Sequence, residues 1–397
     1  MLVEIHVVQN HAPSNLNRDD TGSPKDCVFG GVRRSRISSQ CIKRSVRRSP
    51  LFEEGLEGAD LGIRTRHLPQ EVKKLLLGRG LASDLAEVAA EKASGFGNSE
   101  GKEQPNGLTA QAMFLTKGDI DAVASVLHEA AMAAGSAADF RKVGAGDLQE
   151  KSELRGWRPI TADIALFGRM TTSGAFRDVE AAMQVAHAIS THKMDHEFDY
   201  FTAVDDLQGL DDDEDAGASH INDTEFNSAC YYKYFSLDLA ALIANLAGPE
   251  PREKTPKADH EAYASRVAEA KGAALRVVAS FIRAAVFTTP TGKQNSFAAH
   301  QLPDAILAEV RCRKTPVSYA NAFVKPARAH GEVDLVEDSL AKFSEHVGTL
   351  TRKFSLEASP RLWFSTREAT IPGTVACDSL DELLARLGAA LEGANGQ

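Results

Sequence analysis

The segment from Lys25 to Arg48 has the composition of a surface that binds a phosphate backbone. It contains eight lysines and arginines and one acid, Asp26, whereas the whole chain of 397 residues carries a net charge of −10. Residues 195–225 show the opposite bias, with twelve acids and no lysine or arginine. Such a separation of charge predicts one surface that attracts a polyanion and another segment that is kept away from it.

The residue types within the cationic segment suit contacts with phosphate. Gly30 and Gly31 permit positive φ and a close approach of the backbone. Ser38 or Ser39 can cap a helix whose first N–H groups attract anions. At about 100° per residue, the polar side chains of this helix share one face. The candidates in this segment for contact with RNA or DNA are Arg33, Arg34, Arg36, Ser38, Ser39, Gln40, Lys43, Arg44 and Arg47. The alternative is a solvated cationic face on which the serines only cap the helix.

Two other segments could contact nucleotides. The tripeptide Gly168-Arg169-Met170 and the residues Tyr200, Phe201 and Thr202 could wedge between or stack under unstacked bases, although such side chains more often belong to a core or an interface. The sequence Thr291-Gly292-Lys293-Gln294 has some features of a phosphate-binding loop. However, Phe287 stands where that loop has its first glycine, and Gln294 replaces its Ser or Thr, so nucleotide hydrolysis is not expected.

Metal-dependent chemistry has two candidate sites. Asp19, Asp20 and Asp26 could bind Mg²⁺ for phosphodiester cleavage. The neighbours Arg18 and Lys25 offer a simpler account, in which the acids form ion pairs and cap turns within the loop. Three histidines between residues 187 and 196 include an i, i+4 pair, but a lysine stands where an HExxH motif has its glutamate. The five dispersed cysteines form no zinc or disulfide pattern. We therefore expect neither a metal nor a cofactor.

Hydrophobic patterning predicts a mixed α+β domain of the ferredoxin-like kind with helical and hairpin insertions. A strand over 2–8 is followed by a loop over 9–37. Helices are predicted at 38–49, 70–92, 109–134, 176–191, 258–285, 334–354 and 379–391, and strands or extended segments at 157–170, 229–236, 305–312 and 361–366. No leader and no apolar run long enough for a membrane span are evident, so a cytoplasmic protein without membrane contact is expected.

Several motifs, taken in their order along the chain, resemble the signature of the CasC family. CasC is the Cse-type backbone subunit of the type I-E CRISPR surveillance complex Cascade. These motifs are LNRDDTGSPKD at 16–26, FGG at 29–31, RISSQ at 36–40, FGRM at 167–170, FTAVDDL at 201–207 and GKQNSF at 292–297. The resemblance covers most of the chain, and the joint pattern is far more specific than any one piece.

The resemblance implies a protein shaped like a hand. An RRM-like (ferredoxin-like) palm of residues 1–50 and 225–397 would carry a mainly helical fingers insertion, 51–190, and an acidic thumb hairpin, 191–224. Copies would line up in a helical filament along the CRISPR guide RNA and present it for pairing with target DNA. The large, small, end-capping and guide-processing subunits of Cascade would be further partners in antiviral defence, and this subunit would be no enzyme.

The resemblance also implies roles for single residues. Guide phosphates would be held by Arg18, Ser38, Gln40, Lys43 and Arg47. Met170 would wedge against bases near a kink in the guide, next to Arg169, and Phe201 and Thr202 would lie in the thumb. Lys293 and Gln294 would contact the guide or the neighbouring copy. The acidic run Asp211–Asp215 is no part of the family pattern, and we expect it to point away from the RNA.

Two other functions compete with the guide-RNA scaffold. The first is a metal-dependent RNA-cleaving backbone subunit, as in related type III complexes, that uses Asp19, Asp20 or Asp26. Regularly spaced RNA products in the presence of Mg²⁺ would indicate it. The second is a protein-only module whose basic face binds an acidic partner such as residues 195–225. The absence of co-purifying nucleic acid would favour that alternative.

Overall fold

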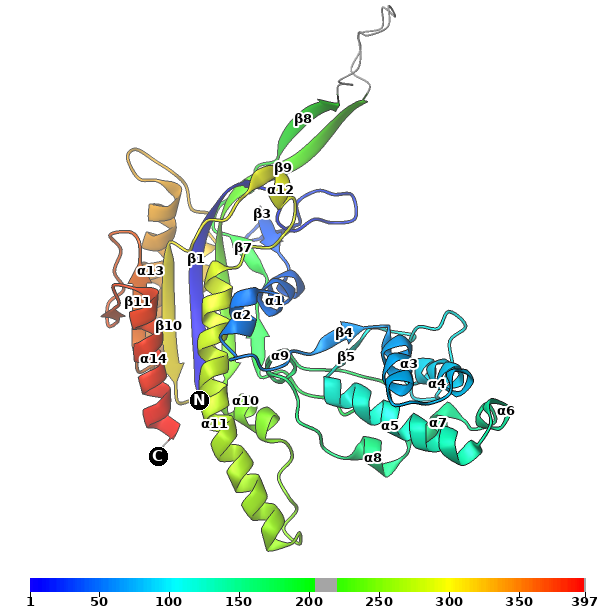
Figure 1. The fold of residues 1–397 in the computed structure, drawn as a ribbon. Coiled ribbons are helices and arrows are strands. Elements are labelled where there is room, and N and C mark those ends of the chain that lie inside the picture. The colour runs from blue at the N-terminus through cyan, green and yellow to red at the C-terminus, as the bar shows by residue number, and fades with distance from the viewer. Residues whose placement is uncertain (204–219, 396–397) are drawn as a thin grey trace, which may run out of the picture. The chain divides into compact units, whose positions relative to one another are not determined.

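A computed structural model describes residues 1–203 and 220–395, and the chain divides into two compact units (Figure 1). The first unit contains Met1–Phe52, Val185–Leu237 and the chain from Ala279 onward, and the second contains Glu53–Gln184 and Asp238–Val278. The predicted helical insertion, 51–190, overlaps most of the second unit. That unit also takes in the segment after Leu237, which the sequence analysis assigned to the palm.

A ten-stranded sheet forms the centre of the first unit, with the strand order β12-β11-β10-β1-β9-β7-β3-β2, and β6 and β8 also pair with β9. The strands are β1 (Leu2–Ser14), β2 (Asp26–Phe29), β3 (Val32–Ile37), β6 (Met183–Val185), β7 (Ala188–Ser190), β8 (Glu197–Ala203), β9 (His220–Asp238), β10 (Ala305–Arg311), β11 (Arg361–Ser365) and β12 (Val375–Ala376). Strand β1 is antiparallel to β10, with Leu2 opposite Arg311 and Val8 opposite Ala305. Its central place explains why Leu2 to Gln9 are all buried.

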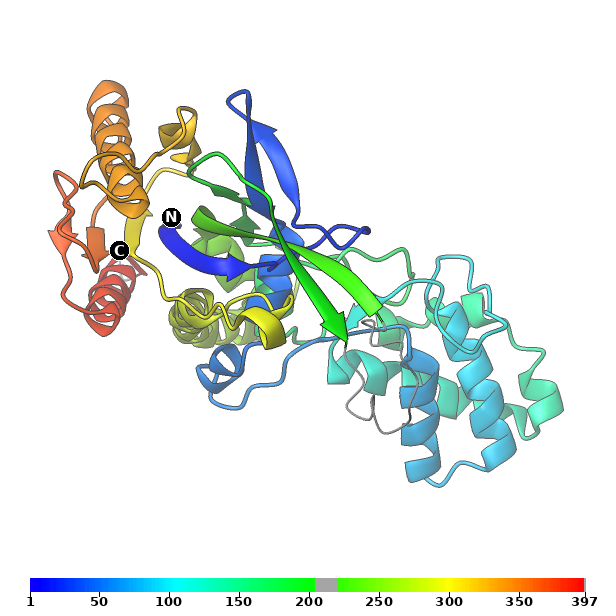
Figure 2. The same cartoon turned by 90° about the horizontal axis from the view of Figure 1, so that it is seen from above.

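Helices cover both faces of this sheet. They are α1 (Ser39–Arg47), α2 (Pro50–Glu54), the last part of α11 (Lys257–Phe287), α12 (Gln294–Phe297), the 3-10 helix η1 (Ala320–Phe323), α13 (Leu335–Phe354) and α14 (Leu380–Asn395). Figure 2 shows α13 on one face and α11 and α14 on the other. Because side chains alternate along a strand, β1 sends one set to each face. On the α13 face, Val8, Leu307 and Trp363 pack in one cluster with Phe343 and Val347.

The α13 face also buries a network of charges. Glu4 of β1 and Glu309 of β10 lie on either side of Arg311, which donates to both carboxylates. Arg361 of β11 donates to Glu309 at 2.7 Å, and the Glu309 carboxylate lies 3.5 Å from the His6 ring. All five side chains are at most 7% exposed. The two arginines offset the two carboxylates, which is the condition under which buried charges are tolerated.

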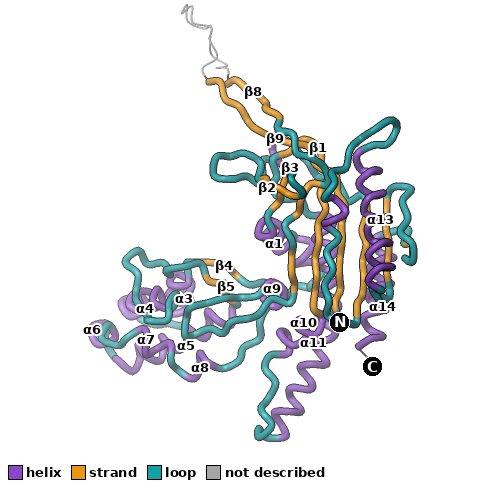
Figure 3. The backbone as a smooth tube through the Cα atoms, turned by 180° about the vertical axis from the view of Figure 1, so that it is seen from behind, coloured by secondary structure: helices purple, strands orange, loops and turns teal. Residues whose placement is uncertain are grey.

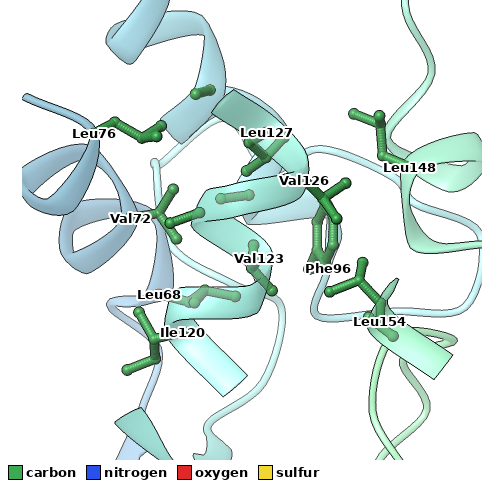
Figure 4. Packing of buried hydrophobic residues seen from close by; sticks show 14 of the residues in the cluster. Leu68, Val72, Leu76, Phe96, Ile120, Val123, Val126, Leu127, Leu148 and Leu154 are labelled. Atoms are coloured by element: carbon green, nitrogen blue, oxygen red, sulfur yellow. The ribbon is translucent and has the colours of Figure 1, made fainter. Parts of the chain in front are cut away.

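The second unit is a helical body with a two-stranded ribbon. Its elements are β4 (Ile63–Thr65), α3 (Leu68–Gly78), α4 (Ser83–Gly95), β5 (Met113–Leu115), α5 (Lys117–Ala134), α6 (Ala137–Phe140), α7 (Ala145–Gln149), α8 (Ser152–Arg155), α9 (Ala162–Phe167) and α10 (Leu239–Ala247). Helix α5 begins with a capping box formed by Thr116 and Asp119. Buried side chains of α3 and α5, among them Leu68, Val72 and Val123, pack in one cluster that also includes Phe96 (Figure 4).

Most predicted elements are confirmed, but several predictions are wrong. Residues 70–92, predicted as one helix, form α3 and α4, and the predicted helix 109–134 contains β5 before α5 begins at Lys117. The predicted loop 9–37 contains the end of β1 and the β2–β3 hairpin, the extended segment 157–170 contains α9, and the helix 176–191 is replaced by β6 and β7. The β2–β3 hairpin was not predicted because a charged residue, Arg34, occupies a buried position of β3, so the strand lacks the usual alternation of apolar and polar residues. Within the residues described, no helix has both the length and the apolar character needed to cross a membrane.

Candidate nucleic-acid interface

A groove of about 1000 Å³ lies within the first unit. One wall is the loop 16–22, another is the end of α1 with the residues that follow it, and the third is the end of α11 with the loop after it. The side chains that can meet a ligand there include Arg18, Arg44, Ser45, Arg48, Phe287, Thr289, Thr291 and His300. Three arginines and several hydroxyl groups give this groove the chemistry of a site for a phosphate backbone.

Helix α1 forms as the sequence predicts. The Ser38 side chain accepts a hydrogen bond from Cys41 N at 3.3 Å, and Ile42 and Val46 are buried beneath the helix. Arg44 and Arg48 are exposed, one turn apart, and both line the groove. Arg48 is not among the predicted contacts, although its i, i+4 spacing from Arg44 could have placed it on the same flank.

The remaining candidates on α1 lie outside the residues that line the groove. Gln40 is exposed, and Lys43 and Arg47 are half-buried, with burial lowering the pKa of Lys43. At the start of the helix, Ser39 N donates to Nδ1 of His187 at 3.2 Å. No local pattern predicts that contact, because His187 lies far along the chain on the segment that leads into β7.

The loop 17–23 is organised by Asp19. Its Oδ1 accepts from the hydroxyl of Thr21 at 2.7 Å, from Thr21 N at 2.9 Å and from Ser23 N at 3.0 Å. The hydrogen bond from the Thr21 side chain, together with those from the backbone, lowers the pKa of Asp19. This turn leaves Arg18 and Asp20 exposed at the rim of the groove.

The loop aspartates do not gather into a cation site. Asp26 forms an ion pair with Arg33 on the neighbouring strand. Among the described residues, the group of three potential metal ligands whose atoms lie within 4.8 Å of one another is Glu4, His6 and Glu309, which are buried. The two carboxylates of that group are already paired with Arg311 and Arg361.

The loop that follows α11 packs closely against the end of β1. A Cβ added to Gly292 would lie 2.5 Å from Leu16 O and 2.6 Å from Asn15 O. Gln294 Oε1 accepts from Ala299 N at 2.7 Å, and Gln294 Nε2 donates to Pro290 O at 3.0 Å. The Gln294 side chain therefore holds the shape of its own loop, and its contact with a ligand stays a prediction. Lys293 beside it is half-buried and has a φ of +51°.

Replacing Gly292 by alanine should push this wall away from loop 16–22. Since both nearby atoms belong to the backbone, they cannot rotate aside, and we expect a loss of about 1–3 kcal/mol of stability. The free energy of unfolding in urea measures the effect. Gly348 in α13 has open space around its Cβ position, so Gly348→Ala is the matched control and should not destabilise the chain. Equal stability of the Gly292→Ala variant would show that the wall adjusts without cost.

The wall rests on buried polar side chains. Gln9 Nε2 donates to Gln301 O at 2.6 Å, and Ala12 N donates to the Gln301 side chain at 3.2 Å. Burial, helped by the charge of Lys233, lowers the pKa of His11 to about 3. Burial also lowers the pKa of Lys233 to about 8. His11 is therefore neutral at pH 7 and adds no second buried charge beside that of Lys233.

Arg34 was predicted to contact RNA or DNA, and the structure contradicts this prediction. It is fully buried, and its guanidinium donates to the carbonyl oxygens of Thr191 at 2.9 Å, Ser190 at 3.2 Å and Phe323 at 2.7 Å. Because the Arg34 side chain is buried by these contacts, it cannot contact a ligand. Arg34 instead joins the β2–β3 hairpin to β7 and to η1. Arg33 is exposed, and Arg36 is half-buried and donates to Asp26 O at 3.0 Å.

Replacing Arg34 by methionine should destabilise the first unit by about 2 kcal/mol. The change keeps much of the side-chain volume but leaves several buried carbonyl groups without a donor. Urea unfolding of the two proteins gives the difference. Arg33→Met is the control on the same strand, because exposed ion pairs such as that of Arg33 contribute little. Similar small losses in both variants would contradict a bracing role for Arg34.

Arg169, in the second unit, was also predicted to contact the ligand, and its burial contradicts this prediction. It is 7% exposed and donates to Asp119 at 2.6 Å and to Arg177 O at 3.0 Å. Asp119 also accepts from Arg158 at 3.0 Å, so Arg169 belongs to a buried ion-pair network. Met170 is 94% exposed, which suits the predicted apolar contact with a ligand.

Strands β8 and β9 form a hairpin arm that extends beyond the rest of the sheet (Figure 3). Phe201 lies opposite Asn222 and is 45% exposed, and Thr202 beside it is also exposed. Phe198 and Tyr200, at 52% and 73% exposed, add an apolar surface to the arm. The acidic run 211–215 lies outside the described residues.

The histidines between 187 and 196 do not converge. His187 contacts the start of α1, whereas Nε2 of His192 accepts from Cys230 N at 3.2 Å. His196 pairs with Glu225 across the base of the arm. Each ring therefore has a separate structural contact.

The chain resembles known proteins over almost its whole length. A family model described as CT1975-like protein matches residues 3–386. A solved structure entitled "CRISPR RNA-guided surveillance complex, pre-nicking" contains a chain that is 29% identical, with a TM-score of 0.79 and coverage of 98% of this chain and 100% of that one. Another, entitled "CRISPR RNA-guided surveillance complex", is 25% identical, with a TM-score of 0.69 and the same coverage. No curated protein matches the sequence.

Proposed function

We propose that this chain, which belongs to the CT1975-like protein family, is a guide-RNA-binding subunit of a CRISPR surveillance complex. The observation that carries the proposal is the groove, where Arg18, Arg44 and Arg48 face hydroxyl groups of the loop after α11. The structural likeness to chains of RNA-guided complexes over 98% of the sequence supports the same function.

The groove suits an RNA whose sequence varies. Its donors are arginine and hydroxyl groups, which contact phosphate and ribose without reading the edges of bases. A guide scaffold must hold any spacer sequence, so this kind of contact is what the function requires. Sequence recognition is then left to pairing between the guide and its target DNA.

The sheet supports an RRM-like palm as the finer description of the fold. Its central order β10-β1-β9-β7, with α1 after β1 and α11 after β9, has the strand order of a ferredoxin-like domain. The helical second unit would then be the fingers, and the β8–β9 arm would be the thumb. The ordered sequence motifs favour the CasC branch of the type I-E complex.

Assembly with copies of itself is part of the proposal. Copies that contact one another head to tail form an open helical array unless something ends it. The guide RNA and the other Cascade subunits would set its length within a cytoplasmic ribonucleoprotein. The exposed aromatic side chains of the arm, at Phe198 and Tyr200, support contacts made outside the single chain.

We propose no catalytic role for the chain. The competing function, RNA cleavage through a loop aspartate, would need carboxylates that are available to Mg²⁺. Asp19 already accepts three hydrogen bonds within its turn, and Asp26 is paired with Arg33. Incubation of the assembled complex with Mg²⁺ and labelled complementary RNA tests this point, and regularly spaced products would overturn the proposal.

The main test is to purify the full chain with its bound nucleic acid and to sequence that nucleic acid. We expect RNA of uniform length derived from CRISPR repeats. DNA, RNA of random origin or no nucleic acid would contradict the proposal. The last outcome would favour the protein-only module whose basic face binds an acidic partner.

A further inference from the structure

We propose that Phe287 is a stacking platform for one base of the RNA in the groove, and that Arg44 and Arg48 hold the phosphate of that nucleotide. The inference rests on the proposed function, because it takes RNA as the occupant of the groove. It adds how a base is held, which a grip on phosphate alone does not require.

Phe287 is an apolar ring left exposed at the end of a buried helix segment. It is the last residue of α11, and Thr288 N donates to Ala284 O at 2.9 Å where the helix ends. Ala284, Ala285 and Val286 are at most 5% exposed, whereas Phe287 is 44% exposed and lines the groove. Burying the remaining ring surface would be favourable, so the position suits a ligand with an apolar face.

The surroundings of the ring define that ligand further. Arg44 and Arg48 reach the groove from α1, and Arg18 reaches it from the loop. Two acids, Asp19 and Asp20, also line the groove, so its three arginines exceed its acids by one charge. The ligand must therefore combine a flat apolar face with an anionic group, and a nucleotide within a strand has both. Aromatic stacking accepts every base, so the platform agrees with binding that ignores sequence.

The test compares two strands that differ only in their bases. The full-length protein is titrated with a short single-stranded RNA and with an abasic ribose-phosphate oligomer of the same length. Phe287→Ala should weaken RNA binding by roughly fivefold or more and leave binding of the abasic oligomer unchanged. The dependence of RNA affinity on salt should stay the same, because no cation is lost. Phe287→Trp should retain the affinity.

Phe354→Ala is the matched control, since Phe354 is 71% exposed at the end of α13 and does not line the groove. Equal loss on both oligomers in Phe287→Ala would mean that the ring only supports the groove, which overturns the inference. Tighter binding of an acidic aromatic peptide than of RNA, lost in Phe287→Ala, would assign the platform to a protein and also overturn it. If the unaltered protein binds no RNA, the proposed function itself fails, which is a separate outcome.

Discussion

Replacing Arg44 and Arg48 together by alanine should weaken the binding of single-stranded RNA by roughly 30-fold, or about 1 kcal/mol for each lost phosphate contact. Both side chains are exposed and line the groove, with Arg44 in the last turn of α1 and Arg48 at its C-cap. Each phosphate contact with a single strand contributes about 0.7 to the slope of log affinity against log salt. The slope should therefore become shallower by about 1.4, which titrations at several salt concentrations measure.

The control for this variant removes two cations elsewhere in the first unit. Arg352 and Lys353 are exposed in the last turn of α13, which covers the opposite face of the sheet from α11. Their double replacement by alanine changes the net charge equally and should leave the affinity within twofold or so, because distant exposed charges are largely screened. Equal losses in both double variants would mean that net charge, and not the groove, attracts the RNA.

The sequence was sufficient to predict the cationic helix because the determinants of α1 are local. Ser38 caps it, and Ile42 and Val46 fix which side is buried, so the polar side follows from helical periodicity. The strand β1 was equally clear from its alternation over residues 2–8. The β2–β3 hairpin was not, because Arg34 is buried by contacts with carbonyl groups more than 150 residues away along the chain.

The groove could be predicted only in part. Its α1 side follows from local patterning, but its other walls depend on contacts between distant segments. The close approach of Gly292 to Leu16 O joins loops that are far apart in sequence, and it brings Thr289, Thr291 and Phe287 to the same groove as Arg48. Arg169 shows the converse. A cation inside a recognised motif was expected to touch the ligand, but its partner Asp119 lies fifty residues earlier and holds it in a buried network.

The buried charges beneath α13 should make Arg311 one of the most important residues for stability. Arg311→Met leaves Glu4 and Glu309 with Arg361 as the remaining nearby arginine, and removing one member of a buried ion network costs about 3–5 kcal/mol. Urea unfolding at pH 7 measures this loss. Arg313→Met, two residues along and exposed, is the matched control and should change stability by less than about 0.5 kcal/mol.

The pH dependence of the same pair of proteins distinguishes lost charge pairing from lost packing. Burial alone raises the pKa of Glu309, but the contact with His6 and the charges of Arg311 and Arg361 more than offset it and lower the pKa to about 2. In the unaltered protein, this group therefore contributes stability above pH 4.5 that is lost as the pH falls towards 2. Without Arg311, the pKa of Glu309 should rise, so protonation relieves the unpaired charge at a higher pH. The stability difference between Arg311→Met and the unaltered protein should then be smaller at pH 4 than at pH 7. A difference that does not change with pH would mean that Arg311 acts through its packing alone.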